Sequence, residues 1–262
     1  PAIMGELYEA DMLHVDLITV NGKSVEENVK NHRSKNQDVI RKVDNPIMEN
    51  SGFMVLSGNL FDSALMKTSV ISNDFRNRFL SNKGEENILK AKAVVFEGPE
   101  DYHERLNSPD LEIDEKNILF IRGVGCVGYP GSAEVVNMQP PDDLLKKGIT
   151  HLPTVGDGRQ SGTSESPSIL NASPESVVGG GLAYLKTGDS VILDLNKGTL
   201  NADVNKLEWN KRIERWQKPT IENHTPWQEI YRNNVGQLAD GGCLELATAY
   251  KRIVKYLPRD NH

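Results

Sequence analysis

Residues 93–121 contain two short apolar runs, Ala93-Val94-Val95-Phe96 and Ile118-Leu119-Phe120-Ile121, with the helix-like stretch Pro99–Leu106 between them. Short apolar runs bounded by turn residues are typical of buried strands, and a helical stretch between two such runs favours an α/β arrangement. The same pattern extends outward in both directions. Further strand candidates are Phe53–Leu56, Val70–Ile71, Leu152–Val155 and Val191–Leu195, and further helical stretches are Pro141–Lys147 and Pro174–Lys186. The sequence therefore predicts a mixed α/β fold.

The helix predicted after residue 173 has clear start signals. Ser173 is a suitable N-cap, Pro174 suits the first helical position, and Glu175 suits the positive end of the helix dipole. Farther on, Val191–Leu195 and Thr199–Val204 flank the turn residues 196–198 and predict a hairpin that closes a sheet or barrel. Helical spacing also marks Leu207–Trp216 and Gly242–Leu257.

The beginning of the chain has a different organisation. Ile3, Met4 and Leu7 lie on one helical face, so residues 1–14 are predicted to be the tail of a helix or linker from a missing N-terminal domain. Residues 15–262 are predicted to form one further domain. Within it, Val15–Val20 is a strand candidate before the turn dipeptide Asn21-Gly22. Ser24 and Glu27 form a capping box for a helix to Val29, and Asn31–Asn50 is a polar connection.

Charge and cysteine content exclude several classes of protein. The 262 residues include 30 Lys and Arg against 37 Asp and Glu, for a net charge of −7, and no dense basic cluster that would favour nucleic acid. The sequence contains no run of about 18 apolar residues, which is the length that predicts a membrane-spanning helix. The two cysteines, Cys126 and Cys243, form neither a disulfide framework nor a C-x-x-C metal site, which fits a reducing compartment such as the cytoplasm.

Three stretches rich in Gly and small polar residues are candidates for a ligand site: Ser57-Gly58-Asn59, Gly123–Glu134 and Gly156–Ser166. The second and third follow strand candidates, where α/β folds often place ligand-binding loops. A Ser/Gly/Thr loop by itself is more often a simple turn. The glycines at 123–131 match neither the Walker nor the dinucleotide-binding pattern, so nucleotide binding is not favoured.

These stretches also carry motifs that resemble a known family. The motifs are Pro1-Ala2-Ile3-Met4-Gly5-Glu6-Leu7, Ser57-Gly58-Asn59-Leu60, Ala93-Val94-Val95-Phe96-Glu97-Gly98-Pro99-Glu100, Tyr129-Pro130-Gly131-Ser132-Ala133-Glu134-Val135-Val136-Asn137-Met138 and Gly156-Asp157-Gly158-Arg159-Gln160-Ser161-Gly162-Thr163-Ser164. Together they resemble the C-terminal part of the dihydroxy-acid and 6-phosphogluconate dehydratase superfamily, and the L-arabinonate and D-xylonate dehydratases in particular.

The resemblance implies a swivelling β/β/α domain with a β-barrel-like core flanked by helices. It also implies a carbon–oxygen lyase that dehydrates a 2,3-dihydroxy sugar acid to the 2-keto-3-deoxy acid. Such enzymes use an iron–sulfur cluster, [2Fe–2S] or [4Fe–4S], together with Mg²⁺, and the cluster ligands lie in the N-terminal domain. The isolated 262 residues are therefore expected to be inactive. A homodimer or homotetramer is implied as the assembly.

By the same resemblance, Ser161 corresponds to the serine whose alkoxide takes the C2 proton, while cluster iron assists loss of the 3-hydroxyl. Thr163 corresponds to the neighbouring residue that orients substrate or base. Glu134 corresponds to a Mg²⁺ ligand, although a lone glutamate is more often a solvated carboxylate.

Arg159 and His262 are weaker substrate-binding candidates. Arg159 would pair with a substrate carboxylate or form an internal salt bridge with Asp157 or another acid. His262 carries an imidazole and the terminal carboxylate, but chain ends are commonly disordered.

Two alternatives remain from the sequence alone. The first is a non-catalytic binding or scaffolding domain that kept the fold. The second is an aconitase-like swivelling domain with different substrates, from which the loop at residues 156–163 distinguishes this chain.

Overall fold

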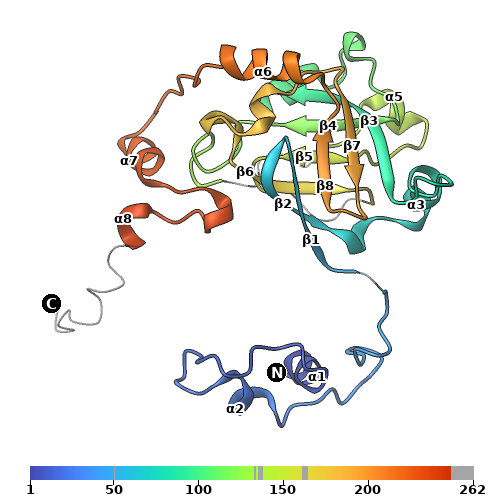
Figure 1. Ribbon diagram of the computed structural model, residues 1–262, viewed down its shortest axis with the longest axis vertical. Helices are drawn as coiled ribbons and strands as arrows, with labels where there is room; N and C mark the ends of the chain where they lie inside the picture. Colours follow the sequence, from blue (N-terminus) through green and yellow to red (C-terminus); the bar gives the residue numbers. More distant parts are fainter. Residues whose placement is uncertain (50, 133, 135–137, 161–164, 249–262) are drawn as a thin grey trace. The chain divides into compact units, whose positions relative to one another are not determined.

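The computed structural model describes residues 1–262 except 50, 133, 135–137, 161–164 and 249–262 (Figure 1). Contacts within the chain divide it into two compact units, Pro1–Ser51 and Gly52–His262. The sequence predicted that residues 1–14 are the tail of a helix or linker from a further N-terminal domain and that residues 15–262 form one domain. That division stays a prediction.

The first unit contains two short helices, α1 (Ala2–Glu9) and α2 (Val25–Val29). The predicted capping box is confirmed, because Ser24 Oγ accepts from Glu27 N and Ser24 N donates to the Glu27 carboxylate. The strand predicted at Val15–Val20 is wrong. Only an isolated bridge between Ile18 and Ser24 forms there, since Ile18 and Val20 stay exposed and no second strand covers them.

The second unit is built on a closed eight-stranded barrel, which confirms the predicted α/β fold with a barrel core (Figure 1). Its strand order is β1-β2-β6-β5-β4-β3-β7-β8. The strands are β1 (Phe53–Gly58), β2 (Phe61–Lys67), β3 (Ile88–Phe96), β4 (Asn117–Ile121), β5 (Thr154–Gly156), β6 (Ser168–Ser173), β7 (Ser190–Asp194) and β8 (Thr199–Ala202).

Strand direction sets which loops share an end of this barrel. Strands β3, β4, β5 and β6 run parallel to one another, so their carboxyl ends lie together. The predicted hairpin is confirmed by antiparallel pairing of β7 and β8. Strand β8 then pairs in parallel with β1, where Ser57 faces Thr199, and this contact closes the barrel.

The helices of the second unit are short. They are α3 (Asn73–Phe79), α4 (Pro99–Arg105), α5 (Asp142–Lys146), α6 (Lys206–Arg215), α7 (Pro226–Asn234) and α8 (Glu245–Thr248), with 3-10 turns η1 (Thr68–Val70), η2 (Pro109–Leu111), η3 (Ser176–Val178), η4 (Gly181–Tyr184) and η5 (Leu238–Asp240). No helix of the described residues is long and apolar enough to cross a membrane.

The apolar core has two parts, and β4 contributes to both. Ile118 and Phe120 belong to a cluster that draws residues from all eight strands, which is the barrel interior. Leu119 and Ile121 point the other way and pack with Tyr102 and other residues of the helical layer. All five residues of β4 are buried, which explains why its sequence is an unbroken apolar run.

Two further predictions are wrong in this unit. Val70–Ile71 is not a strand, because Thr68–Val70 forms the 3-10 turn η1. Pro174–Lys186 is not one helix but the two turns η3 and η4. Glycines interrupt it: Gly179 has φ +92°, and a Cβ on Gly180 would lie 1.8 Å from the Pro174 carbonyl oxygen. Of the helix predicted over 242–257, residues 245–248 are helical and 249–257 lie outside the described residues.

Candidate functional site

The described parts of the first two glycine-rich stretches and the beginning of the third, Gly156–Gln160, lie at one end of the barrel. The second follows the carboxyl end of β4 and the third follows the carboxyl end of β5, and these parallel strands end side by side. The first connects β1 to β2, and Ser63 near the start of β2 pairs with Ser173 at the end of β6. The loops that carry the family motifs are thus gathered around one opening of the barrel, as expected for a ligand site in such a fold.

Asp157 joins the loops after β4 and β5. Its carboxylate is fully buried, at 0 % exposure, and accepts hydrogen bonds from Gly123 N at 3.0 Å and Val124 N at 2.9 Å. It also accepts from the backbone N and the Oγ of Ser176, at 2.9 and 2.6 Å. The two loops approach so closely that a Cβ on Gly158 would lie 2.3 Å from the Val124 carbonyl oxygen. Asp157 therefore fixes the relative position of the two motif loops.

Arg159 makes a second link between these loops. Its Nε donates to the carbonyl oxygen of Ser132 at 2.6 Å, and Glu134 lies two residues beyond Ser132 with an exposed side chain. The alternative of a salt bridge with Asp157 is not seen, because that carboxylate is bonded to Gly123, Val124 and Ser176 instead. No acid of the described residues forms an ion pair with Arg159.

The other predicted site residues, Ser161, Thr163 and His262, lie outside the described residues. The structure thus brings the loop of Glu134 together with Arg159. The roles assigned to all five residues stay predictions.

Glu175 is a buried carboxyl group at the same end of the barrel that sequence reasoning placed at a helix start. It is only 2 % exposed and accepts hydrogen bonds from Val127 N at 2.9 Å and Gly128 N at 2.9 Å. Gln237 pairs with it reciprocally: its Nε2 donates to Glu175 Oε1 at 3.0 Å, and its Oε1 accepts from Glu175 N at 2.8 Å. Burial raises the pKa of the Glu175 carboxyl, and these N–H donors oppose that rise.

Neither cysteine suits a metal cluster. Cys126 is buried, and its burial, followed by the nearby Glu175 charge, raises the pKa of the thiol and disfavours the thiolate that a cluster needs. Cys243 is exposed. Within the described ranges, no group of three or more His, Cys, Asp or Glu side chains is arranged to hold a metal ion. The exposed Glu134 carboxylate supplies the oxygen chemistry that Mg²⁺ prefers, but as a single ligand.

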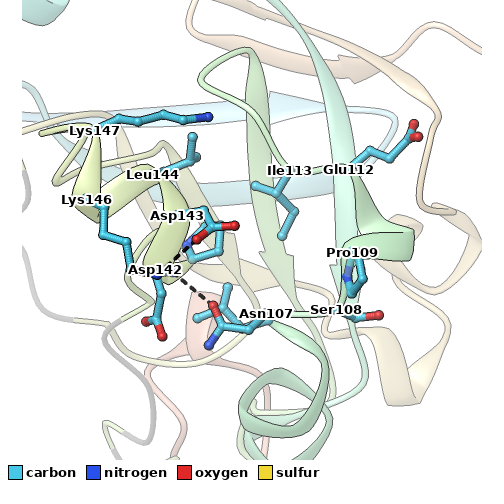
Figure 2. A pocket seen from close by; sticks show the side chains of 12 residues that line it. Asn107, Ser108, Pro109, Glu112, Ile113, Asp142, Asp143, Leu144, Lys146 and Lys147 are labelled. Carbon is cyan, nitrogen blue, oxygen red and sulfur yellow. Dashed lines mark hydrogen bonds and ion pairs between the residues drawn. The ribbon is translucent and has the colours of Figure 1, made fainter.

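A pocket of about 350 Å³ lies between the connection after α4 and helix α5 (Figure 2). Charged side chains, among them Glu112, Asp142 and Lys147, line it, and Asp142 N donates to Asn107 Oδ1 at 2.9 Å. None of its lining residues belongs to the three glycine-rich stretches, so this pocket is separate from the candidate site.

Comparison with known proteins gives consistent matches. Residues 38–243 match the family model described as dihydroxy-acid/6-phosphogluconate dehydratase C-terminal. The chain is 53% identical to D-xylonate dehydratase of Caulobacter vibrioides over 262 residues, which cover 100% of this chain and 44% of that protein. It is 38% identical to L-arabinonate dehydratase of Rhizobium leguminosarum bv. trifolii over 218 residues, which cover 83% and 36% of the two proteins.

A more distant relative shows the breadth of the match. Dihydroxy-acid dehydratase of Acetivibrio thermocellus is 32% identical over 247 residues, covering 94% of this chain and 42% of that protein. The chain therefore spans less than half the length of each of these relatives. The matched family model covers most of the chain, and the resemblance found from the sequence motifs is confirmed. The chain belongs to the dihydroxy-acid/6-phosphogluconate dehydratase family and carries its C-terminal domain.

Proposed function

We propose that the whole protein is a sugar-acid dehydratase, a carbon–oxygen lyase that converts a 2,3-dihydroxy sugar acid to the 2-keto-3-deoxy acid. One observation carries this proposal: buried Asp157 and the Arg159 side chain fasten the two motif loops together at one end of the barrel. The 53% identity to D-xylonate dehydratase over the entire chain favours a pentonate as substrate.

In the proposed reaction, the C2 proton leaves to a base and the 3-hydroxyl leaves as water. The resulting enol tautomerises to the 2-keto acid, so no oxidant or reductant is consumed. We assign Ser161 as the base and Thr163 as the residue that orients substrate or base. Arg159 is assigned to the substrate carboxylate, with which a guanidinium group can make paired hydrogen bonds. His262 is assigned as a residue that reaches substrate in a neighbouring site.

Glu134 is assigned as the Mg²⁺ ligand of this chain. When bound, Mg²⁺ supplies positive charge that acidifies the C2 proton and favours ionisation of a serine hydroxyl. The described cysteines do not fit an iron–sulfur cluster, so we assign its ligands to an N-terminal cluster-binding domain outside these 262 residues. A homodimer or homotetramer in the cytoplasm completes the proposal, and the isolated 262 residues are expected to be inactive.

The test uses the full-length protein with its cluster reconstituted and Mg²⁺ added, assayed against a panel of pentonates and hexonates. We expect D-xylonate or a stereoisomer to yield a 2-keto-3-deoxy acid. Ser161→Ala should lower kcat by about 100-fold or more, as expected for loss of a positioned base, while cluster absorbance is retained. Ser81→Ala is the matched control, because Ser81 lies between α3 and β3, outside the three glycine-rich stretches, and its Oγ donates to Asn77 O of α3.

Undiminished dehydration of every sugar acid by Ser161→Ala would refute the role of that serine. Failure of the wild-type protein to dehydrate any acid on the panel would refute the proposed function. Substrate binding without turnover would then favour the non-catalytic binding domain as the function of this fold.

A further inference from the structure

One dipeptide of the loop after β4, Val127-Gly128, is held from both sides. Its two N–H groups donate to the Glu175 carboxylate. Its two carbonyl oxygens accept from Arg232, with Val127 O at 2.9 Å from Nε and Gly128 O at 3.4 Å from Nη2. An anion and a cation thus fix the four polar groups of one short backbone segment, and we call this arrangement the Glu175–Arg232 clamp.

Packing does not explain why Arg232 lies there. Arg232 is on α7, and that helix has no buried residue. Its guanidinium is bonded to Val127 O and also to the carbonyl oxygen of Glu222 at 2.7 Å, so it ties the segment before α7 to the same loop. Gln237, just after α7, supports Glu175 from the other side through its paired hydrogen bonds. Residues 222–237 therefore contact this loop through Arg232 and contact Glu175 through Gln237, in addition to the apolar burial of Val235.

Further hydrogen bonds hold the loop between the clamp and Ser132. Tyr129 N donates to Gly125 O at 2.8 Å, and Ser132 N donates to Tyr129 O at 2.8 Å. The Ser132 carbonyl oxygen is then held by Arg159, and Glu134 follows two residues later. The backbone of this loop is thus held at residues 127–128 and again at Ser132, two positions before Glu134.

We propose that Glu175, Arg232 and Gln237 are positioning residues that hold the loop after β4 so that Glu134 is presented for Mg²⁺. This inference rests on the proposed function, because it takes Glu134 as the metal ligand. Groups bonded directly to a metal ligand commonly change metal affinity 10- to 100-fold when removed, and we expect the lower end here because the clamp holds residues 127 and 128 and not Glu134 itself.

The experiment compares Arg232→Ala and Arg232→Lys in the full-length protein. Mn²⁺ replaces Mg²⁺ as the probe, its binding is measured by electron paramagnetic resonance, and hydrogen exchange of the peptide spanning 123–131 is followed in parallel. Arg78→Ala is the matched control, since it removes an arginine from an ion pair with Glu115 on a different part of the barrel.

For Arg232→Ala we expect about tenfold weaker Mn²⁺ binding and faster exchange of the Val127 and Gly128 amides. Arg232→Lys should lie between the wild type and the alanine variant, because lysine keeps the charge but not the planar pair of donors. Excess Mg²⁺ should restore much of the lost turnover of Arg232→Ala. Arg78→Ala should match the wild type in both measurements.

Faster exchange with unchanged Mn²⁺ affinity would overturn the proposal, because the clamp would then serve stability alone. Unchanged exchange would also overturn it. If Arg232→Ala does not fold, the lysine variant decides by the same two measurements. Absence of dehydratase activity in the wild type would refute the proposed function, whereas the Mn²⁺ comparison would still test the clamp.

Discussion

Two glycine-containing loops at the same end of the barrel are held in different ways. In the β1–β2 turn, Asn59 pairs reciprocally with the backbone of Ala202, at 2.9 and 2.8 Å, and Asn59 N donates to Asn201. A Cβ on Gly58 would lie 2.1 Å from Leu200 O. Every one of these partners belongs to β8, so the glycine and asparagine of this turn serve closure of the barrel.

The loop after β4 is held by ionisable side chains instead. Asp157, Glu175 and Arg232 come from three separate segments, and each bonds to backbone groups of residues 123–128. Removing two carboxylates and a guanidinium from water costs free energy that backbone partners would not require. The two loops are similar in glycine content, but the first is held by its contact with β8 and the second by charged side chains from other segments.

The largest expected effect comes from Asp157→Ala. This change removes the acceptor of the buried N–H groups of Val124 and Ser176 and leaves Gly123 N with Ser176 Oγ alone, so we expect the free energy of unfolding to fall by about 3 kcal/mol or more. Urea unfolding of the 262-residue chain, followed by tryptophan fluorescence, measures it. A loss below about 1 kcal/mol would show that water replaces the carboxylate at little cost.

Gly58→Ala should have the next largest effect, on the other loop. The added methyl group meets Leu200 O, and overpacking of this kind lowers the free energy of unfolding by about 1–3 kcal/mol. Because the strain lies in the β1–β8 contact, hydrogen exchange of Val127 and Gly128 in the folded state should stay at the wild-type rate. Faster exchange at those amides would mean that the two loops are coupled, and would contradict the view that separate contacts hold them.

Gly131→Ala tests the clamped loop without a steric clash. No atom lies within 4 Å of the position of its Cβ, so the cost arises only from its φ of +89°, a left-handed conformation. We expect a loss of about 1 kcal/mol in thermal unfolding measurements. Gly22→Ala in the first unit, where φ is +80° and the surroundings are equally open, is the matched control and should cost a similar amount.

The smallest expected effect is a pH dependence of stability from Glu175. Its pKa is raised by burial above the ordinary 4.5, and the N–H donors partly offset that rise. The folded state then binds more protons than the unfolded state between pH 4.5 and the raised value, so this group's contribution to stability falls as pH increases through that interval. Glu175→Gln should lack this fall. Urea unfolding of both proteins at several pH values from 4 to 8 measures this difference. If the free energy of unfolding changed equally with pH in both proteins, the pH dependence would not come from Glu175.

Sequence patterns predicted those parts of the fold that local chemistry determines. The capping box at Ser24, the apolar run of β4 and the hairpin of β7 and β8 were all correctly predicted. Strands β2 and β6 were missed because polar residues interrupt their apolar pattern, and Asn171 in β6 has φ +58°. Helix α7 was also missed, although Thr225 and Pro226 are recognisable start signals.

The candidate site was predictable only in part. Gly-rich composition marked three stretches as ligand-site candidates, and the structure places the loops after β4 and β5 side by side, while their role as a ligand site stays a prediction. The role of Glu175 was not readable, because its partners at 127 and 128 lie 48 and 47 positions away along the chain. Local signals at Ser173 and Pro174 favoured a helix, and the long-range contacts of Glu175 and the following glycines determined otherwise.

Closure of the barrel by β1 and β8 also has a consequence for how the chain reaches its native state. Asn59 and Asn201, which meet beside this closure, are 142 positions apart, so forming this contact carries the entropy cost of closing a long loop. A chain interrupted before Thr199 would leave β1 and β7 as unpaired sheet edges. Such edges recruit strands from other molecules, so truncation in the β7–β8 turn should produce aggregates rather than a smaller folded domain.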